Sequence, residues 1–309
     1  MAHHDEDDPG ELDPDRVVVA IADQFPALAG LPVTRLGAGD DHEAFGVGDE
    51  WVVRVARRAE QAAWLARERE ILTLAREALG SAAPRVELVG RPSQALPFPF
   101  AGYRRLVGIG ADALARGPSV ELAGDLGRAL RSLHRIDPAR VPPAPGPALL
   151  YRPERVAAEI VDAAGRIAPL LDPELCRRAE PYLTGARPVP PRDAPRRFIH
   201  NDMSPEHVIV DRRRGRLVGL IDFADATVGD PVIDFVGLIG LGGWPFIARV
   251  VAHYDLALGA GWADRLSWLV RVLTLRWLAI VAVRDPARVP VHREWVRHAL
   301  ADPDALPVP

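Results

Sequence analysis

A pair of short apolar segments joined by a tight turn constrains this chain more than any other feature. Residues 208–221 read as a strand, an Arg-Arg-Arg-Gly hairpin turn and a returning strand. This arrangement places Asp202 in the loop before the hairpin, His207 at the start of its first strand and Asp222 directly after its second strand. We therefore expect the three polar side chains to converge at one end of a rigid two-stranded element.

These residue types suit phosphoryl transfer from a nucleotide, a reaction whose catalysis relies on positioning and on neutralisation of charge. One carboxylate orients the attacking hydroxyl and accepts its proton, and a second carboxylate holds the metal ion that bridges the phosphates. Protein kinases use H-R-D-x-x-x-x-N followed by D-F-G for these roles. This chain has His200-x-Asp202-x-x-x-x-His207 and then Asp222-Phe-Ala224, so histidine replaces the asparagine and alanine replaces the glycine.

Three motifs in order resemble those of the aminoglycoside phosphotransferase family, the small-molecule relatives of protein kinases. That family carries H-x-D-x-x-x-x-[N/H], I-D-[FW]-x-x-A and G-D-P-x-x-D, which are found here at residues 200–207, 221–226 and 229–234. With a histidine at the end of the first motif, the chain resembles the branch of the family that includes the 2''-aminoglycoside and macrolide kinases. The resemblance implies a two-lobed, protein-kinase-like α+β fold with a β-rich N-lobe and a mainly helical C-lobe.

The resemblance also implies roles for single residues. Asp202 is the expected catalytic base, and His207 and Asp222 are expected to hold Mg²⁺. Imidazole nitrogen is a better ligand for softer metals than for magnesium. His207 is therefore expected to bind the ion either directly or through water. Asp230 and Asp234 stand near a helix start, where acids satisfy free backbone N–H groups, and are expected to brace the catalytic loop.

The segments before these motifs supply the expected nucleotide site. Residues 33–56 read as glycine-punctuated strands, and Gly37 and Gly39 are expected to form a flexible turn over the phosphates. Arg54 stands in an apolar strand where the resembled family usually carries lysine or arginine. Because the chain contains no lysine, we expect the guanidinium of Arg54 to bind the phosphate oxygens.

An acid on the next helix is expected to pair with that cation. Glu68 and Glu70 are the two candidates, and because they point to different helix faces, only one of them points inward. The family's pattern favours Glu68. Residues 103–108, with Arg104 and Leu106, are expected to form the hinge whose backbone reads the purine edge. Because recognition by the backbone leaves almost no trace in the sequence, the sequence does not decide between ATP and GTP as the co-substrate.

The chain divides into an acidic disordered tail at 1–14, a nucleotide-binding N-lobe at 15–107 and a helical C-lobe at 108–309. In the second of these lobes we expect His134, Trp268 and Trp277 to be packing residues. Apolar periodicity predicts helices at residues 15–25, 60–79, 118–136, 157–171, 173–183 and 262–282.

Composition excludes several classes of protein. The 309 residues include one cysteine, Cys176, so a disulfide framework is not expected and a reducing, cytoplasmic setting fits. The formal net charge of −4 gives no sign of nucleic-acid binding. The first residues are acidic and lack an apolar core, unlike a signal peptide. The longest apolar stretch is interrupted by Arg271, Arg276 and Arg284, which argues against a membrane span.

The acceptor is the least constrained part of the prediction. The resemblance implies a small-molecule antibiotic, an aminoglycoside first, with a macrolide or a basic peptide antibiotic as rivals. Kinases of choline, homoserine and similar alcohols share the fold, and a pseudokinase also stays open. Residues 115–309 hold 26 arginines against 23 acids, so a polycationic acceptor would need a local acidic pocket. A monomer and a homodimer are both compatible with the sequence.

Overall fold

A computed structural model describes residues 12–38, 42–58, 61–144, 152–191 and 193–302. The chain divides into two compact units, one made of Met1–Leu106 with Pro142–Gly146 and the other of Val107–Val141 with Pro147–Pro309. Most of the predicted tail, and the predicted site residue Gly39, lie outside the described residues.

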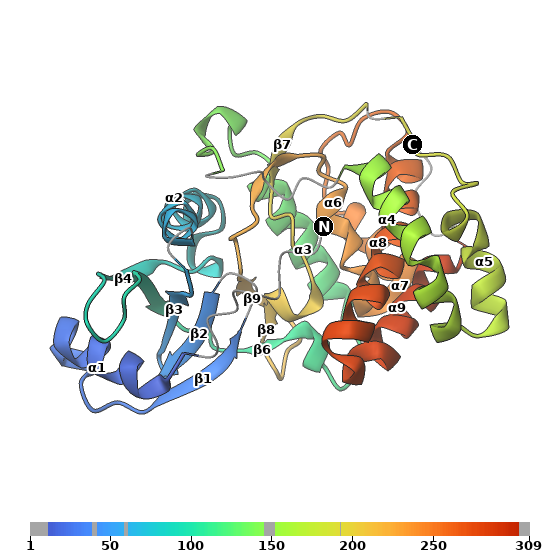
Figure 1. The fold of residues 1–309 in the computed structure, drawn as a ribbon. Coiled ribbons are helices and arrows are strands. Elements are labelled where there is room, and N and C mark those ends of the chain that lie inside the picture. The colour runs from blue at the N-terminus through green and yellow to red at the C-terminus, as the bar shows by residue number, and fades with distance from the viewer. Residues whose placement is uncertain (1–11, 39–41, 59–60, 145–151, 192, 303–309) are drawn as a thin grey trace. The chain divides into compact units, whose positions relative to one another are not determined.

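An antiparallel five-stranded sheet forms the centre of the first unit (Figure 1). Its strand order is β1-β2-β3-β5-β4, so β3, which carries Arg54, is the central strand and pairs with both β2 and β5. Gly48 adopts a left-handed φ of 55° in the turn that joins β2 to β3. The strands are β1 (Val33–Ala38), β2 (His42–Val47), β3 (Trp51–Ala56), β4 (Val86–Gly90) and β5 (Phe100–Arg104).

Two helices accompany this sheet. Helix α1 (Pro14–Gln24) begins at a proline after the N-cap Asp13, whose side chain accepts from the Asp15 N–H. Its apolar face joins Phe45 and other buried strand residues in the core of the unit. Helix α2 (Gln61–Leu79) follows β3 and buries two charged residues, Arg67 and Glu68, besides its apolar ones. Because buried charges must be paired, these two side chains of α2 need ion-pair or hydrogen-bond partners as well as packing contacts.

The second unit is mainly helical, with two small sheets beside the helices (Figure 1). Helix α8 contacts α4, α6 and α9, and helix α7 contacts α3 and α9. The helices are α3 (Val120–Leu133), α4 (Pro153–Ile167), α5 (Pro173–Leu183), α6 (Ile233–Val236), α7 (Ile239–Val251), α8 (Trp262–Arg284) and α9 (Val289–Leu300). The strands are β6 (Ile109–Gly110), β7 (Arg197–Ile199), β8 (Val208–Val210), β9 (Leu217–Leu220) and β10 (Thr227–Gly229).

Helix α8 is the one helix within the described ranges that is long and apolar enough to cross a membrane. Its most apolar window is 61% buried inside the protein, and it packs against three other helices. A buried core helix passes the same test of length and composition, so the test alone is weak evidence for a membrane span.

Most predicted helices are confirmed, and the differences have local causes. Helix α4 begins at Pro153 rather than at residue 157, because proline with its fixed φ favours the first helical position. It ends before Pro169, where a short 3₁₀ turn follows. Helices α7 and α9 were not predicted from the sequence. Gly242 and Gly243 interrupt α7 with non-helical backbone and Pro245 lies inside it, so that segment does not have the pattern of a regular helix.

Two glycines on helices of the second unit give a matched test of this packing. A Cβ on Gly127 of α3 would lie 2.5 Å from the Val250 carbonyl oxygen of α7, whereas a Cβ on Gly165 of α4 would meet no atom within 4 Å. Gly127→Ala should lower the free energy of unfolding by about 1–3 kcal/mol through overpacking. Gly165→Ala should raise it by about 0.5–1 kcal/mol, because alanine favours the helix. Urea denaturation of both variants measures the difference, and equal effects would contradict the close approach of α3 and α7.

Candidate active site

The predicted hairpin is confirmed and fixes the ends of the candidate site. Strands β8 and β9 pair antiparallel, and β6 extends them into a small sheet. A 3₁₀ turn, Pro205–His207, leads into β8, so His207 lies at the start of the hairpin. The backbone N–H of Ile221, at the end of the hairpin, donates to the His207 carbonyl oxygen over 3.0 Å. Asp222, the next residue, therefore lies at the same end of the hairpin as His207.

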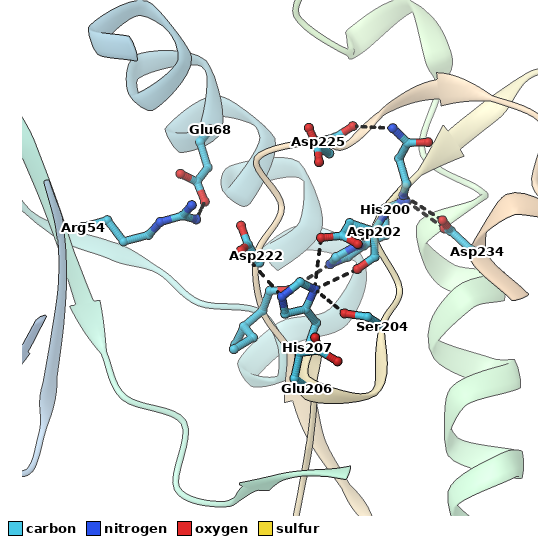
Figure 2. A network of polar contacts seen from close by, with 12 residues as sticks. Arg54, Glu68, His200, Asp202, Ser204, Glu206, His207, Asp222, Asp225 and Asp234 are labelled. Carbon is cyan, nitrogen blue, oxygen red and sulfur yellow. Dashed lines mark hydrogen bonds and ion pairs between the residues drawn. The ribbon is translucent and has the colours of Figure 1, made fainter. Parts of the chain in front are cut away.

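The imidazole of His207 lies between the two carboxylates (Figure 2). Its Nδ1 is 3.4 Å from a carboxylate oxygen of Asp202, and its Nε2 is 3.7 Å from a carboxylate oxygen of Asp222. Nδ1 also lies 2.9 Å from the Asp202 carbonyl oxygen and 3.0 Å from the Ser204 hydroxyl oxygen. Burial opposes a charge on this ring, but the negative charges of Asp202 and Asp222 outweigh it and raise the pKa of His207.

The carboxyl group of Asp202 has an unusual affinity for protons. Its pKa is raised to about 6, chiefly by burial and in part by the charges of nearby acids, with Asp222 first among them, while the charge of His207 opposes the rise. Its side chain is nevertheless 36% exposed. A carboxylate that is reachable, ionised at neutral pH and more basic than an ordinary aspartate has the properties of a general base.

A buried carboxylate holds the loop that carries Asp202 (Figure 2). The Asp234 carboxylate accepts from the backbone N–H groups of His200 and Asn201, each over 2.8 Å, and is 2.9 Å from Nε2 of His134. Its pKa would be raised by burial, but these partners, the hydrogen bond with His134 first among them, keep it low. The predicted brace is thus confirmed for Asp234. Asp230 accepts from the backbone N–H of Val232 at the predicted helix start over 3.1 Å, and it also accepts from Nε of Arg265 over 2.8 Å.

Two residues of the site adopt left-handed backbone without being glycine. Asn201 has a φ of 67° and Asp222 a φ of 63°. Such conformations are disfavoured and persist only where surrounding contacts hold them. The Asp234 carboxylate supplies that hold for Asn201. These turns direct the side chains that follow the strands, and no local sequence pattern predicted them.

The ring of His200 connects the loop to the last residue of the hairpin, Ile221. Its Nε2 donates to the Ile221 carbonyl oxygen over 2.9 Å, and its Nδ1 accepts from the Asp202 N–H over 3.3 Å. The contact with the Asp202 N–H requires the neutral ring, because only an unprotonated Nδ1 accepts a hydrogen bond. Burial, the largest effect, lowers the pKa of His200 and favours this neutral form. This histidine therefore connects the residues before Asp202 with the residue before Asp222.

The donor set at His207 and Asp222 offers a magnesium ion one carboxylate and one ring nitrogen. Within the part of the chain that the structure describes, no group of three or more His, Cys, Asp and Glu side chains is arranged to hold a metal ion. In the neutral His207 ring, Nδ1 donates to the Asp202 carbonyl oxygen, which leaves the lone pair of Nε2 on the side of Asp222. One carboxylate with one further donor fits Mg²⁺, which usually takes its remaining ligands from phosphates and water.

The first unit contains the predicted ion pair. Nη1 of Arg54 donates to Oε1 of Glu68 over 2.5 Å, and both side chains are largely buried. Glu70 is exposed. The pairing of Arg54 with Glu68 is confirmed by this contact, and the contribution of the pair to nucleotide binding stays a prediction.

The other predicted nucleotide-binding residues of this unit have varied surroundings. Gly37 lies in β1, where a Cβ would meet no atom within 4 Å. The side chain of Arg104 is exposed, pairs with Glu50 and covers the ring of Trp51 at 4.2 Å from its centroid. Leu106 is half-buried. Arg104 would therefore contact the purine through its backbone, as the hinge prediction requires.

Two contributions to the site differ from the sequence prediction. Trp277 was predicted to be a core residue but is half-buried and lines a small cavity beside Asp202. His134 was predicted to be a packing residue; it is buried, and its ring joins Asp234 to the hydroxyl group of Tyr254, 2.6 Å from Nδ1. The Tyr254 contact could not be found from local motifs, because 120 residues separate it from His134.

The neutral His200 ring predicts a dependence of stability on pH. A histidine whose folded-state pKa lies below its usual 6.5 loses stabilising free energy as pH falls through 6.5, because the unfolded chain then binds the proton more readily. The stability advantage of the wild-type protein over His200→Gln should therefore shrink from pH 7.5 to pH 5.5. Urea unfolding in the presence of a chelator measures it. His253→Gln, at an exposed position, is the control and should show no such change.

Comparisons with known proteins agree with this geometry. Residues 32–295 match the model of the family described as "Phosphotransferase enzyme family". The uncharacterised protein YcbJ of Bacillus subtilis (strain 168) is 41% identical over 66 residues, which cover 21% of this chain and 21% of that protein.

Solved structures of phosphotransferases also resemble this chain. The GDP complex of wild-type aminoglycoside 2'-phosphotransferase-IIIa is 26% identical, with a TM-score of 0.70 over 93% of this chain and 98% of that one. Macrolide 2'-phosphotransferase MphH of Brachybacterium faecium, at 22% identity and a TM-score of 0.57 over 94% of this chain and 98% of that one, shares the fold. Since the family match covers most of its length, the chain belongs to the phosphotransferase enzyme family and is a kinase with a kinase-like α+β fold.

Proposed function

We propose that this kinase transfers the γ-phosphoryl group of ATP or GTP to a hydroxyl group of a small-molecule antibiotic, in the presence of Mg²⁺. The observation that carries the proposal is that the carboxylates of Asp202 and Asp222 lie on the two sides of the His207 ring. The loop that carries Asp202 is held by the buried carboxylate of Asp234. It is supported by the relative at 26% identity whose structure holds GDP and kanamycin. A cytoplasmic setting, where both nucleotides are present, goes with this proposal.

Asp202 is the base in this mechanism. Its carboxylate accepts the proton of the acceptor hydroxyl while the hydroxyl oxygen forms a bond to the γ-phosphorus. The bond from that phosphorus to the oxygen bridging the β- and γ-phosphates breaks, and the nucleoside diphosphate leaves. The pKa of about 6 suits the role, because the group is mostly ionised at neutral pH and still holds a proton better than an ordinary aspartate.

Asp222 and His207 are the residues that would hold the magnesium ion. A magnesium ion held there would supply positive charge that stabilises the negatively charged phosphates during transfer. Asp222 offers a carboxylate that is 36% exposed, and His207 offers the lone pair of Nε2 on the same side. In the first unit, Arg54 is proposed to contact the nucleotide phosphates, with Glu68 fixing the orientation of its guanidinium.

The acceptor is proposed from the relatives. Kanamycin is bound in the relative at 26% identity, so an aminoglycoside is the first class of acceptor to test, with resistance to it as the biological role. A macrolide is the second class, and the fold alone supports it.

Removal of the base separates catalysis from binding. Asp202→Asn should lower kcat by at least about 10²-fold, because the hydroxyl proton loses its acceptor. The Kd for nucleotide should stay within about twofold, because the base meets the acceptor and not the nucleotide. Mass spectrometry of an antibiotic panel incubated with magnesium, ATP and GTP measures transfer, and isothermal titration measures nucleotide binding.

The matched control is Asp264→Asn, the same exchange at an exposed carboxylate of the second unit, which should leave both measurements unchanged. Loss of nucleotide binding together with turnover in Asp202→Asn would contradict the assignment of the base. If no compound gains a phosphoryl group although the wild-type protein binds nucleotide, antibiotic phosphorylation itself is wrong.

The ion pair of the first unit has its own matched test. Glu68→Gln should lower kcat/KM for the nucleotide by about tenfold or more, because Arg54 loses a charged hydrogen-bond partner. Glu70→Gln changes an exposed acid two residues along the same helix and should have no effect. Steady-state kinetics with varied nucleotide distinguish the variants. Equal kinetics for the two would show that the pair serves the fold alone.

A further inference from the structure

A cavity of about 350 Å³ lies in the second unit and is not used by the mechanism above. It is bounded by the start of α4, the segment before β7, the end of β10 and one face of α8. Most of its walls are apolar, with Pro153, Pro195, Val228 and Leu269 among them. Its volume is within the range of pockets that bind small molecules.

The cavity adjoins the catalytic loop. Ile233 lines both this cavity and the small cavity in which Asp202 takes part. On α8, Leu269 lines the larger cavity, and Leu273 and Trp277 line the smaller one. These three residues are spaced by four and share a helix face, with about 6 Å of rise between successive members. The two cavities therefore follow one another along this face of α8. The smaller one, of about 10 Å³, has room for a water-sized group, so only a narrow part of an acceptor seated in the larger cavity would reach the base through it.

The charged groups of the larger cavity are predominantly cationic. Arg152 and Arg196 line it, and neither forms an ion pair with a carboxylate among the described residues. Asp230 is the acid of the lining, and Nε of Arg265 donates to it over 2.8 Å. The remaining nitrogens of Arg265 donate to backbone carbonyl oxygens over 2.5 and 2.6 Å, so this pair is neutral and saturated.

A buried donor without a partner completes the lining. The side chain of Trp268 is 3% exposed, and its Nε1–H has no hydrogen-bond partner among the described residues. Buried donors are normally satisfied, so the adjoining cavity is the natural source of an acceptor for this group. The indole N–H and the two arginine side chains are all donors, and each of them suits an oxygen-bearing, negatively charged group.

We infer that this cavity is a subsite for the phosphoryl acceptor, and that the acceptor is an apolar molecule with an anionic group. The inference rests on the proposed transfer to a small-molecule antibiotic, and it favours an anionic acceptor over the aminoglycoside class that the relatives suggest. Ammonium groups would meet Arg152 and Arg196 without an unpaired carboxylate to offset the repulsion. A carboxylate or sulfonate would meet the cations and the indole donor, and an apolar body would cover the proline and aliphatic walls.

The binding test needs no nucleotide. The probe is 8-anilinonaphthalene-1-sulfonate, an apolar anion, with its affinity read from fluorescence. Arg196→Glu should weaken binding by about fivefold or more, since it reverses one charge at the cavity. Arg212→Glu, the same reversal at the exposed hairpin turn, is the control. Trp268→Phe keeps an apolar ring, removes the donor and should also weaken binding, and a thermal melt checks its folding.

Millimolar kanamycin, a polycation, should not displace the probe. Displacement by kanamycin, absence of probe binding, or equal affinities of Arg196→Glu and Arg212→Glu would each overturn the inference. The same two arginine variants, assayed with nucleotide on a panel of anionic, neutral and cationic antibiotics, test the link to transfer. Arg196→Glu should lose turnover of anionic acceptors relative to Arg212→Glu, and an unchanged profile would remove the cavity from the acceptor site. Absence of transfer in the wild-type protein would count against the proposed function, while probe binding would still decide the charge preference of the cavity.

Discussion

The Asp234 carboxylate is the interaction on which the catalytic loop depends. Its side chain is fully buried, and a charge in that position is tolerated only when several donors surround it. Two of those donors are backbone N–H groups of the loop, and the third is the ring of His134, which is itself oriented by Tyr254. Removing any one partner would leave a buried polar group unpaired, which costs more free energy than the bond contributes.

This brace explains how disfavoured backbone persists where the chemistry takes place. The left-handed turn at Asn201 changes the direction of the chain just before Asp202. After the second strand of the hairpin, the left-handed turn at Asp222 follows Ile221, whose N–H donates to the His207 carbonyl oxygen and whose C=O accepts from the His200 ring. Two strained turns, each next to a buried hydrogen bond, thus present the carboxylates to the two nitrogens of His207.

The local parts of this arrangement could be predicted from the sequence, and the long-range parts could not. Strand alternation and turn residues located the hairpin and with it the three residues at its ends, and helix spacing reduced the partner of Arg54 to two candidates. The contact of His134 with Tyr254 depends on packing between distant segments, which no local pattern encodes. The cavity beside Trp277 is also formed by separate elements, so an apolar helix pattern read this residue as core. Glycine and proline within α7 hid a helix that tertiary packing stabilises.

The pairing of Arg54 with Glu68 has a consequence for how the enzyme senses acidity. A guanidinium keeps its proton throughout the range in which proteins stay folded, whereas a lysine in a buried site is able to lose its charge. In a chain without lysine, the cation of the nucleotide-binding unit is thus a constant. The pKa of Asp202 is raised to about 6 and that of His207 is raised above its usual value. The cation proposed for the nucleotide phosphates therefore keeps its charge over a range of acidity in which the charges of the catalytic loop change.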